Sequence, residues 1–194
     1  MVQKEKNLKV SVCVITYNQE KYIRQCLQSI VDQEVNFDFE IIVGEDCSTD
    51  GTRAIVQEFA DIYPQMFKPI FHNLNIGGCA NYVAVHQAAV GEYVAHVDGD
   101  DFWSRSKLKT QVRYLEDESD CIAVFHRMAI CNYDGVMKNE YWLKKFDNEK
   151  YDFSQVLLNL SDFVHSSMMY RKNSLNDFFS LKCPQFIDYQ IYIH

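Results

Sequence analysis

The chain has 194 residues and a formal net charge of −8, and 47% of its residues are hydrophobic. This length supports one well-packed domain and is too short for two large ones. Glycine and proline number only 7 and 3, which excludes a collagenous or low-complexity chain, and the lack of a basic stripe argues against nucleic acid as a partner.

The 7 cysteines include no CxxC pair, which indicates reduced thiols rather than a disulfide framework. The N-terminal stretch MVQKEKNLK is charged and has no apolar region of the kind found in signal peptides. No apolar run approaches the length of a membrane span. We therefore expect a cytoplasmic protein.

Strands and helices alternate through the first half of the chain. A continuous β-branched run predicts a buried strand over 10–16, and shorter apolar runs predict strands over 39–43, 69–72 and 93–97. Helical spacing of apolar residues predicts helices over 22–30, 52–63 and 81–89, with Asn18 as a cap of the first and Pro64 as the end of the second. This alternation predicts an α/β domain with a mainly parallel sheet.

The pattern changes after residue 107. An amphipathic helix is predicted over 107–116 and a strand over 122–130, followed by a hairpin turn at Asp134-Gly135. A further strand is predicted over 164–170 and the beginning of a helix over 186–194. No internal repeat or flexible linker interrupts the chain.

Three polar clusters follow predicted strands: Thr16-Tyr17-Asn18, the stretch from Glu45 to Asp50, and the run from Asp98 to Asp101. In an open parallel sheet, ligands bind beyond the carboxyl ends of the strands. The acidic run is the sharpest of the three, because hard divalent cations such as Mg²⁺ and Mn²⁺ prefer carboxylate oxygens. The plainer interpretation is a solvated turn, since aspartate and glycine are common in turns.

Several other motifs each have more than one interpretation. The loop EDCSTDGT is either a simple connection in which Asp50 or Thr52 caps a helix, or a loop that accepts hydrogen bonds from a ligand. Gly77-Gly78 is either an ordinary turn or a place where the backbone comes close to a nucleotide. His96 is predicted to be a core residue. The stretch His165-Ser166-Ser167 indicates a binding-site edge or plain packing, because no GxSxG elbow is present.

Four stretches resemble the family 2 glycosyltransferases in order and spacing: VSVCVITYNQEKYIRQCLQSIVDQ, EIIVGEDCSTDGT, NIGGCANY and GEYVAHVDGDDFWSRSKL. The resemblance runs from about residue 10 to 111, and HSSMMYRK and CPQFIDYQIYI also look like that family's acceptor-side segments. It implies a GT-A fold, with a Rossmann-like, mainly parallel sheet flanked by helices. We expect a single domain over 1–194, with a nucleotide-sugar half over about 8–105 and a C-terminally incomplete acceptor half over about 106–194.

The resemblance also implies roles for individual residues. Asp98 would contact the ribose or the metal, Asp100 would be the main ligand of Mn²⁺ or Mg²⁺, and Asp101 would support them. Asp188 aligns with the catalytic base, although Ile187 stands where the family more often has Glu or Gly. Glu45 is a departure from the first of two family aspartates, one of which contacts uracil. The expected donor-binding residues are Thr16, Tyr17, Asn18, Glu45, Asp46, Gly78, Asp98 and Gly99.

The implied activity is inverting transfer of a sugar, expected from a UDP-sugar, to a saccharide or lipid-linked acceptor in surface polysaccharide synthesis, with peripheral association with a membrane left open. Two alternatives remain at this point. One is a nucleotide-sugar-binding remnant without transferase activity. The other, less favoured, is a metal-dependent phosphatase of the haloacid dehalogenase type, in which the Asp-x-Asp pair would follow the first strand. The absence of a GxxxxGK[ST] loop argues against a P-loop enzyme.

Overall fold

The structure is a computed structural model that describes residues 8–132, 136–141 and 164–174. The described strands are β1 (Val10–Thr16), β2 (Phe39–Glu45), β3 (Phe67–Phe71), β4 (Tyr93–Asp98), β5 (Ala123–Val124), β6 (Ala129–Cys131), β7 (Met137–Tyr141) and β8 (Met169–Arg171). The described helices are α1 (Ile23–Val31), α2 (Thr52–Ile62), α3 (Gly78–Ala88) and α4 (Lys107–Asp117), with short 3-10 helices η2 (His165–Ser167) and η3 (Lys172–Ser174).

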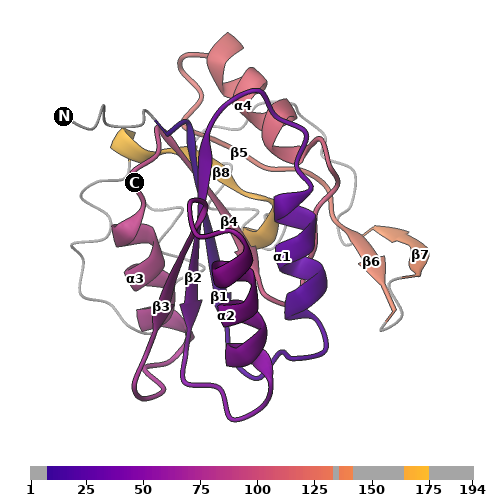
Figure 1. Ribbon diagram of the computed structural model, residues 1–194. Helices are drawn as coiled ribbons and strands as arrows, with labels where there is room; N and C mark the ends of the chain where they lie inside the picture. The colour runs from indigo at the N-terminus through magenta and orange to yellow at the C-terminus, as the bar shows by residue number, and fades with distance from the viewer. Residues whose placement is uncertain (1–7, 133–135, 142–163, 175–194) are drawn as a thin grey trace, which may run out of the picture.

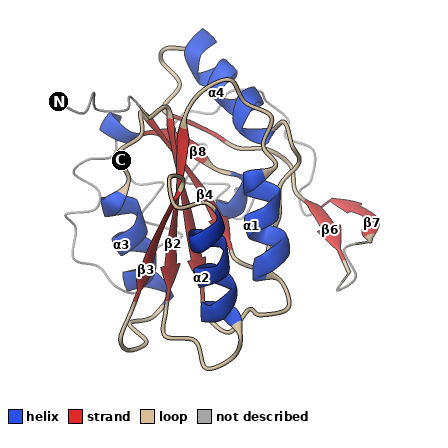
Figure 2. Cartoon of the chain, viewed as in Figure 1, coloured by secondary structure: helices blue, strands red, loops and turns tan. Residues whose placement is uncertain are grey.

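The main sheet has the strand order β3-β2-β1-β4-β8-β5, and Figure 1 and Figure 2 show it at the centre of the molecule. Strands β1 to β4 are parallel, whereas β8 runs antiparallel to both β4 and β5. The chain builds outward from β1 to β2 and β3, and then returns to place β4 on the other side of β1. The order therefore reverses between β1 and β4, which is where open α/β sheets bind ligands.

Alternate residues of the central strands face two different hydrophobic layers. On one face, Val10, Val12 and Val14 of β1 pack with the apolar sides of α1, α2 and α4. On the other face, Cys13 and Val94 pack with α3 and with Met168 and Tyr170. Figure 1 shows α2 in front of the sheet, and α3 contacts β1 and β2 on the other face. Because both faces are covered, these strands are mostly apolar, and the predicted α/β class with a mainly parallel sheet is confirmed.

Several predicted elements differ from the structure. The strand predicted over 122–130 was wrong as one element, since β5 joins the main sheet and β6 pairs with β7 in a separate two-stranded sheet. The strand predicted over 164–170 begins only at Met169, because residues 165–167 form η2. The turn at Asp134-Gly135 and the helix predicted over 186–194 lie outside the described residues.

Asn18 does not cap α1, which corrects that prediction. The helix begins at Ile23, with Tyr22 at the capping position. Asn18 instead has a φ of 52°, in the left-handed region that asparagine tolerates better than most residues. Within the described ranges, no helix is both long and apolar enough to cross a bilayer.

Candidate functional site

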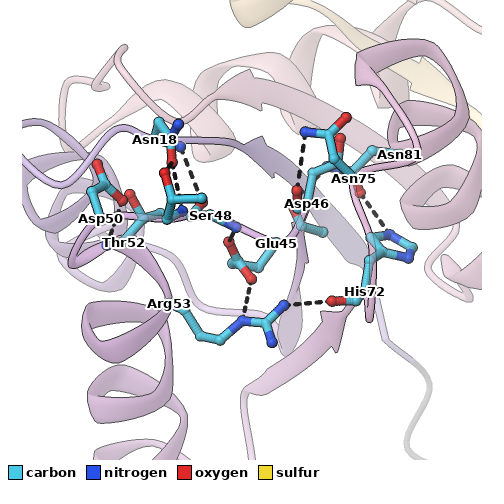
Figure 3. A network of polar contacts seen from close by, with 12 residues as sticks. Asn18, Glu45, Asp46, Ser48, Asp50, Thr52, Arg53, His72, Asn75 and Asn81 are labelled. Atoms are coloured by element: carbon cyan, nitrogen blue, oxygen red, sulfur yellow. Dashed lines mark hydrogen bonds and ion pairs between the residues drawn. The ribbon is translucent and has the colours of Figure 1, made fainter.

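The loops that follow β1 and β2 are joined by reciprocal hydrogen bonds. The backbone N–H of Asn18 donates to Ser48 Oγ (3.0 Å), and Asn18 Oδ1 accepts from the N–H of Thr49 (2.8 Å). The N–H of Glu20 donates to Asp50 Oδ2 at 3.1 Å. Figure 3 shows Asn18 facing Ser48 across this junction. The left-handed backbone at Asn18 therefore serves to hold the two loops together.

Glu45 ends β2 with a completely buried side chain. Its Oε1 accepts the N–H of Ser48 (2.7 Å), and its Oε2 pairs with Nε of Arg53 on α2. Arg53 also donates to the backbone carbonyl of His72, which follows β3. Glu45 thus fixes the loop from inside, in the network drawn in Figure 3.

Asp46 binds the turn that precedes α3. Its Oδ1 accepts the N–H of Ile76 (2.7 Å) and its Oδ2 accepts the N–H of Gly77 (2.9 Å). Asn75 Nδ2 donates to the Asp46 carbonyl at 3.2 Å. Gly77 has a φ of 87°, where a side chain would be strained. Asp46 therefore holds the Asn75–Gly78 turn against the end of β2.

The acidic run begins at the last residue of β4. In the sheet register, Asp98 lies opposite Ile15 of β1, and Thr16 lies opposite Glu45 of β2. The three polar clusters predicted from the sequence are therefore neighbours at the carboxyl edge, on both sides of the switch point. Gly99 fits closely here, since a Cβ at this position would lie 2.5 Å from Gln19 Oε1 and 2.9 Å from the Thr16 Cβ.

Asp98 is held by two side chains from outside the acidic run. Ser166 Oγ accepts the Asp98 N–H at 3.0 Å and lies 3.4 Å from its Oδ2, while His96 Nε2 lies 3.2 Å from Oδ1. The Asp98 side chain remains 40% exposed, so it can still meet a ligand. Burial raises the pKa of Asp98, but the hydrogen bonds from His96 and Ser166 and the imidazole of His165 outweigh this, so that the net pKa is lowered and the carboxylate stays ionised.

The other two carboxyl groups are shifted in the opposite direction. Burial and the charge of Asp98 raise the pKa of Asp100, although a hydrogen bond from Gln19 opposes this. Burial and the charges of Asp98 and Asp100 raise the pKa of Asp101. Three carboxyl groups in four residues therefore repel one another, and a bound cation would relieve that repulsion.

The acidic run can hold a metal ion only with help from a ligand. In the part of the chain that the structure describes, no group of three or more His, Cys, Asp or Glu side chains could bind one. Mg²⁺ and similar ions, however, are commonly bound by one or two carboxylates together with substrate phosphates rather than by a cage of protein ligands. Asp98 and Asp100, one half-exposed and one exposed, fit that mode, in which phosphate oxygens of a ligand would complete the coordination.

Trp103 connects the acidic run to the segment around η2. Its Nε1 donates to the carbonyl of Ser166 at 2.8 Å, and its own N–H donates to Ser29 Oγ at 3.1 Å. The sequence left Ser166 open between a binding-site edge and plain packing, and it assigned neither Gln19 nor Trp103 to the site. The only available signals were the polar HSS within an apolar stretch and the bulky residues after the acidic run. The contacts of Ser166 with Asp98 and Trp103 join residues more than 60 positions apart, so no local pattern in the sequence predicts them.

The structure brings most of the predicted site residues together. Thr16, Asn18, Glu45, Asp46 and Gly99 converge with Asp98 and Asp100 at the carboxyl edge, and Tyr17 lies 44% exposed beside them. Gly78 is exposed, and a Cβ added to it would meet nothing within 4 Å. Asp188 lies outside the described residues. His96 is buried in the core as predicted, yet it also contacts Asp98.

Comparison with known proteins finds relatives that include two named as glycosyltransferases. The chain is 32% identical over 132 residues to TuaG of Bacillus subtilis, a putative teichuronic acid biosynthesis glycosyltransferase, covering 68% of this chain and 51% of the relative. It is 35% identical over 136 residues to the poly(ribitol-phosphate) beta-N-acetylglucosaminyltransferase TarS of Staphylococcus aureus, covering 69% of this chain and 23% of that protein. An uncharacterized protein of Mycobacterium tuberculosis is 41% identical over 133 residues. The chain spans 38% of this last relative.

Solved structures agree with the sequence relatives. A crystal structure of S. aureus TarS superposes with a TM-score of 0.73 at 26% identity, covering 96% of this chain and 54% of that one. The complex of the same protein with UDP-GlcNAc superposes with a TM-score of 0.72 at 27% identity, covering 95% and 53%. The family model described as glycosyl transferase family 2 matches residues 11–179. On this match and on the GT-A architecture it shares with TarS, the chain belongs to glycosyl transferase family 2.

Proposed function

We propose that this protein is an inverting glycosyltransferase that moves a sugar from a UDP-sugar to a hydroxyl group of a saccharide or lipid-linked acceptor in surface polysaccharide synthesis. The observation that carries the proposal is the meeting of three polar clusters at the switch point between β1 and β4. Relatives support the substrate class, since TarS has been solved with UDP and with UDP-GlcNAc. The name of TuaG refers to teichuronic acid biosynthesis.

The nucleoside is assigned to the loops that follow β1 and β2. Thr16, Tyr17 and Asn18 line one side, and the half-exposed ring of Tyr17 offers a flat surface for a base. The turn ending at Gly78, which the buried Asp46 holds in place, forms the other side. Glu45 is assigned a supporting role, because its side chain is completely buried and both of its oxygens already accept hydrogen bonds.

The diphosphate is assigned to the acidic run. Asp98 faces the ribose or a metal, Asp100 is the main metal ligand, and the tight turn at Gly99 sets the spacing between them. When bound, Mn²⁺ or Mg²⁺ would act as a Lewis acid that neutralises charge on the departing diphosphate. The protein's own contribution is to hold two carboxylates at a rigid strand end, so that the donor is oriented before reaction.

Transfer requires a base for the acceptor hydroxyl, and Asp188 is assigned that role. A carboxylate within hydrogen-bonding reach removes the proton as the oxygen attacks the anomeric carbon. Attack from the face opposite the leaving diphosphate inverts the configuration. The donor is assigned to residues from about 8 to 105 and the acceptor to residues from about 106 onward, in a single domain.

The cell compartment is proposed to be the cytoplasm, at the inner face of the membrane if the acceptor is lipid-linked. Six cysteines fall in the described ranges and all six are free thiols. Free thiols are typical of a reducing compartment.

The proposal is tested by incubating the full chain with UDP-, GDP- and dTDP-sugars, with Mn²⁺ or Mg²⁺, in the presence and absence of saccharide acceptors. Release of nucleoside diphosphate reports turnover, and the anomeric configuration of the product reports its stereochemistry. We expect turnover of a UDP-sugar with inversion. Donor binding without turnover would favour the non-catalytic remnant, and failure to bind or turn over any donor would contradict the proposal.

A further inference from the structure

Four side chains from three elements form a continuous chain of hydrogen bonds that ends at the acidic run. The Tyr170 hydroxyl of β8 lies 2.8 Å from His86 Nδ1, and His86 Nε2 of α3 lies 3.1 Å from His96 Nδ1 of β4. His96 Nε2 lies 3.2 Å from Asp98 Oδ1. The two imidazoles and the phenol are at most 3% exposed, whereas Asp98 is partly open.

Neighbouring rings hold this chain in place. Tyr82 stacks on His86 with ring centroids 3.9 Å apart and lies 4.6 Å from the His96 ring. The Tyr170 ring is nearly parallel to that of His86, at an interplanar angle of 8°. The rings therefore have little freedom to rotate, and the polar atoms that face one another stay aligned.

The position of each proton can be worked out from the Asp98 end of this hydrogen-bond chain. The Asp98 carboxylate can only accept, so His96 must carry its proton on Nε2. With neutral imidazoles, His96 Nδ1 then accepts, and His86 must carry its proton on Nε2. His86 Nδ1 in turn accepts from the Tyr170 hydroxyl. Burial lowers the pKa of His86 well below its usual value and raises the pKa of Tyr170, so a neutral imidazole and a protonated phenol suit both places.

We propose that His96, with His86 and Tyr170 behind it, is a positioning residue for Asp98: the chain of donors occupies Oδ1 and turns Oδ2 toward the donor and its metal. This inference rests on the proposed function, because it assumes that Asp98 meets the nucleotide sugar. In metal sites, hydrogen bonds from residues behind the ligands orient them, and loss of such a bond typically lowers affinity about 10- to 100-fold.

The plainer alternative is that these four groups satisfy one another in the core and do nothing else, as buried polar groups generally do. The two interpretations differ in whether distant changes in the chain affect ligand binding at Asp98. If the chain positions the carboxylate, a change at Tyr170, three hydrogen bonds away, alters metal-dependent binding. If the chain only fills the core, such a change alters stability alone.

The first test needs no substrate. Nitrogen-15 NMR of the full chain distinguishes the two imidazole tautomers by the chemical shifts of the ring nitrogens. We expect His96 and His86 each to carry a proton on Nε2. A His96 protonated on Nδ1 alone could not donate to Asp98 and would overturn the proposal.

The second test measures UDP affinity with and without Mn²⁺ for the wild type, His96→Leu, His96→Gln and Tyr170→Phe. We expect His96→Leu to lose about 10- to 100-fold of the Mn²⁺-dependent affinity, and Tyr170→Phe to lose a smaller part. His96→Gln should recover most of it, because the glutamine amide can donate to Asp98. Urea unfolding of each variant checks that it folds, and Tyr170→Phe keeps the test usable if His96→Leu does not.

The outcomes separate the two proposals. If the wild type binds UDP with Mn²⁺ and both His96→Leu and Tyr170→Phe bind it equally well, the positioning role is wrong and the proposed function stands. If the wild type binds no UDP, the proposed function fails, and the positioning role fails with it whatever the NMR tautomers are.

Discussion

Glu45 and Arg53 form an ion pair that ties the end of β2 to the first turn of α2. The Glu45 side chain is completely buried, whereas that of Arg53 is 41% exposed. The same guanidinium donates to the carbonyl of His72 after β3, so one side chain on α2 connects the ends of β2 and β3. The loop that carries Asp46 depends on this connection.

Replacing Arg53 tests that dependence. Arg53→Ala leaves the buried Glu45 carboxylate without its cation, and we expect a loss of about 1–3 kcal/mol in the free energy of unfolding, less than for a fully buried pair because Arg53 is partly exposed. Arg53→Lys should lose less stability than Arg53→Ala, since lysine keeps the charge but not the forked geometry of arginine. The matched control is Arg113→Ala, whose ion pair with Asp117 is exposed and at 3.6 Å, and which should change stability by less than about 0.5 kcal/mol. Equal urea midpoints for Arg53→Ala and Arg113→Ala would contradict this account.

Two glycines give a contrasting pair of substitutions. Gly99→Ala places a Cβ against Gln19 and Thr16, so we expect it to cost about 1–3 kcal/mol and to weaken UDP binding. Gly78→Ala meets nothing within 4 Å and should leave the unfolding free energy unchanged or slightly higher. A loss of UDP affinity in Gly78→Ala at unchanged stability would show that a nucleotide approaches this backbone, and unchanged affinity would remove Gly78 from the site.

The base assignment is tested by Asp188→Asn. The amide cannot take the proton of the acceptor hydroxyl, so transfer should be abolished while UDP binding is kept. Steady-state rates and calorimetric UDP affinity, measured on the same preparation, separate these two effects. Normal turnover in Asp188→Asn would show that another residue is the base.

The buried His86 predicts a pH dependence of stability. Its folded pKa is lowered mainly by burial, and further by His96 and His165, whereas the unfolded value is about 6.5. The unfolded chain therefore binds a proton here first, so stability is complete above about pH 6.5 and falls below it, by up to about 1.4 kcal/mol per pH unit. Between about pH 7.5 and about pH 5.5, the wild type should lose more stability than His86→Gln. Identical losses in urea unfolding would contradict the prediction.

Local patterns predicted much of the fold, because in the first half of the chain the spacing of apolar residues matches the strands and helices that form. The β-branched run at 10–16 became β1 with the same bounds, and the apolar spacing near 22–30 and 52–63 became α1 and α2. The helix capping assigned to Asn18 failed because tertiary hydrogen bonds to Ser48 and Thr49 hold that residue in a left-handed conformation instead.

The second half was less predictable for a physical reason. The run at 122–130 is apolar enough for one strand, but its two ends belong to different sheets. In the site, the three strand-end clusters were visible in the sequence, because the carboxyl ends of parallel strands share an edge. The contacts of Asp98 with Ser166 and of Asp100 with Gln19 were not, since they depend on how distant segments pack.

The thermal unfolding midpoint of the full chain with UDP, GDP or dTDP, each with and without Mn²⁺, tests the donor and metal site most directly. A nucleotide that binds the native state stabilises it by about 2.7 kcal/mol at about 100 times its dissociation constant. We predict a clear rise in the midpoint with UDP that requires Mn²⁺ and is lost in Asp100→Asn. No rise with any nucleotide, in either condition, would contradict the assignment of the acidic run as a donor and metal site.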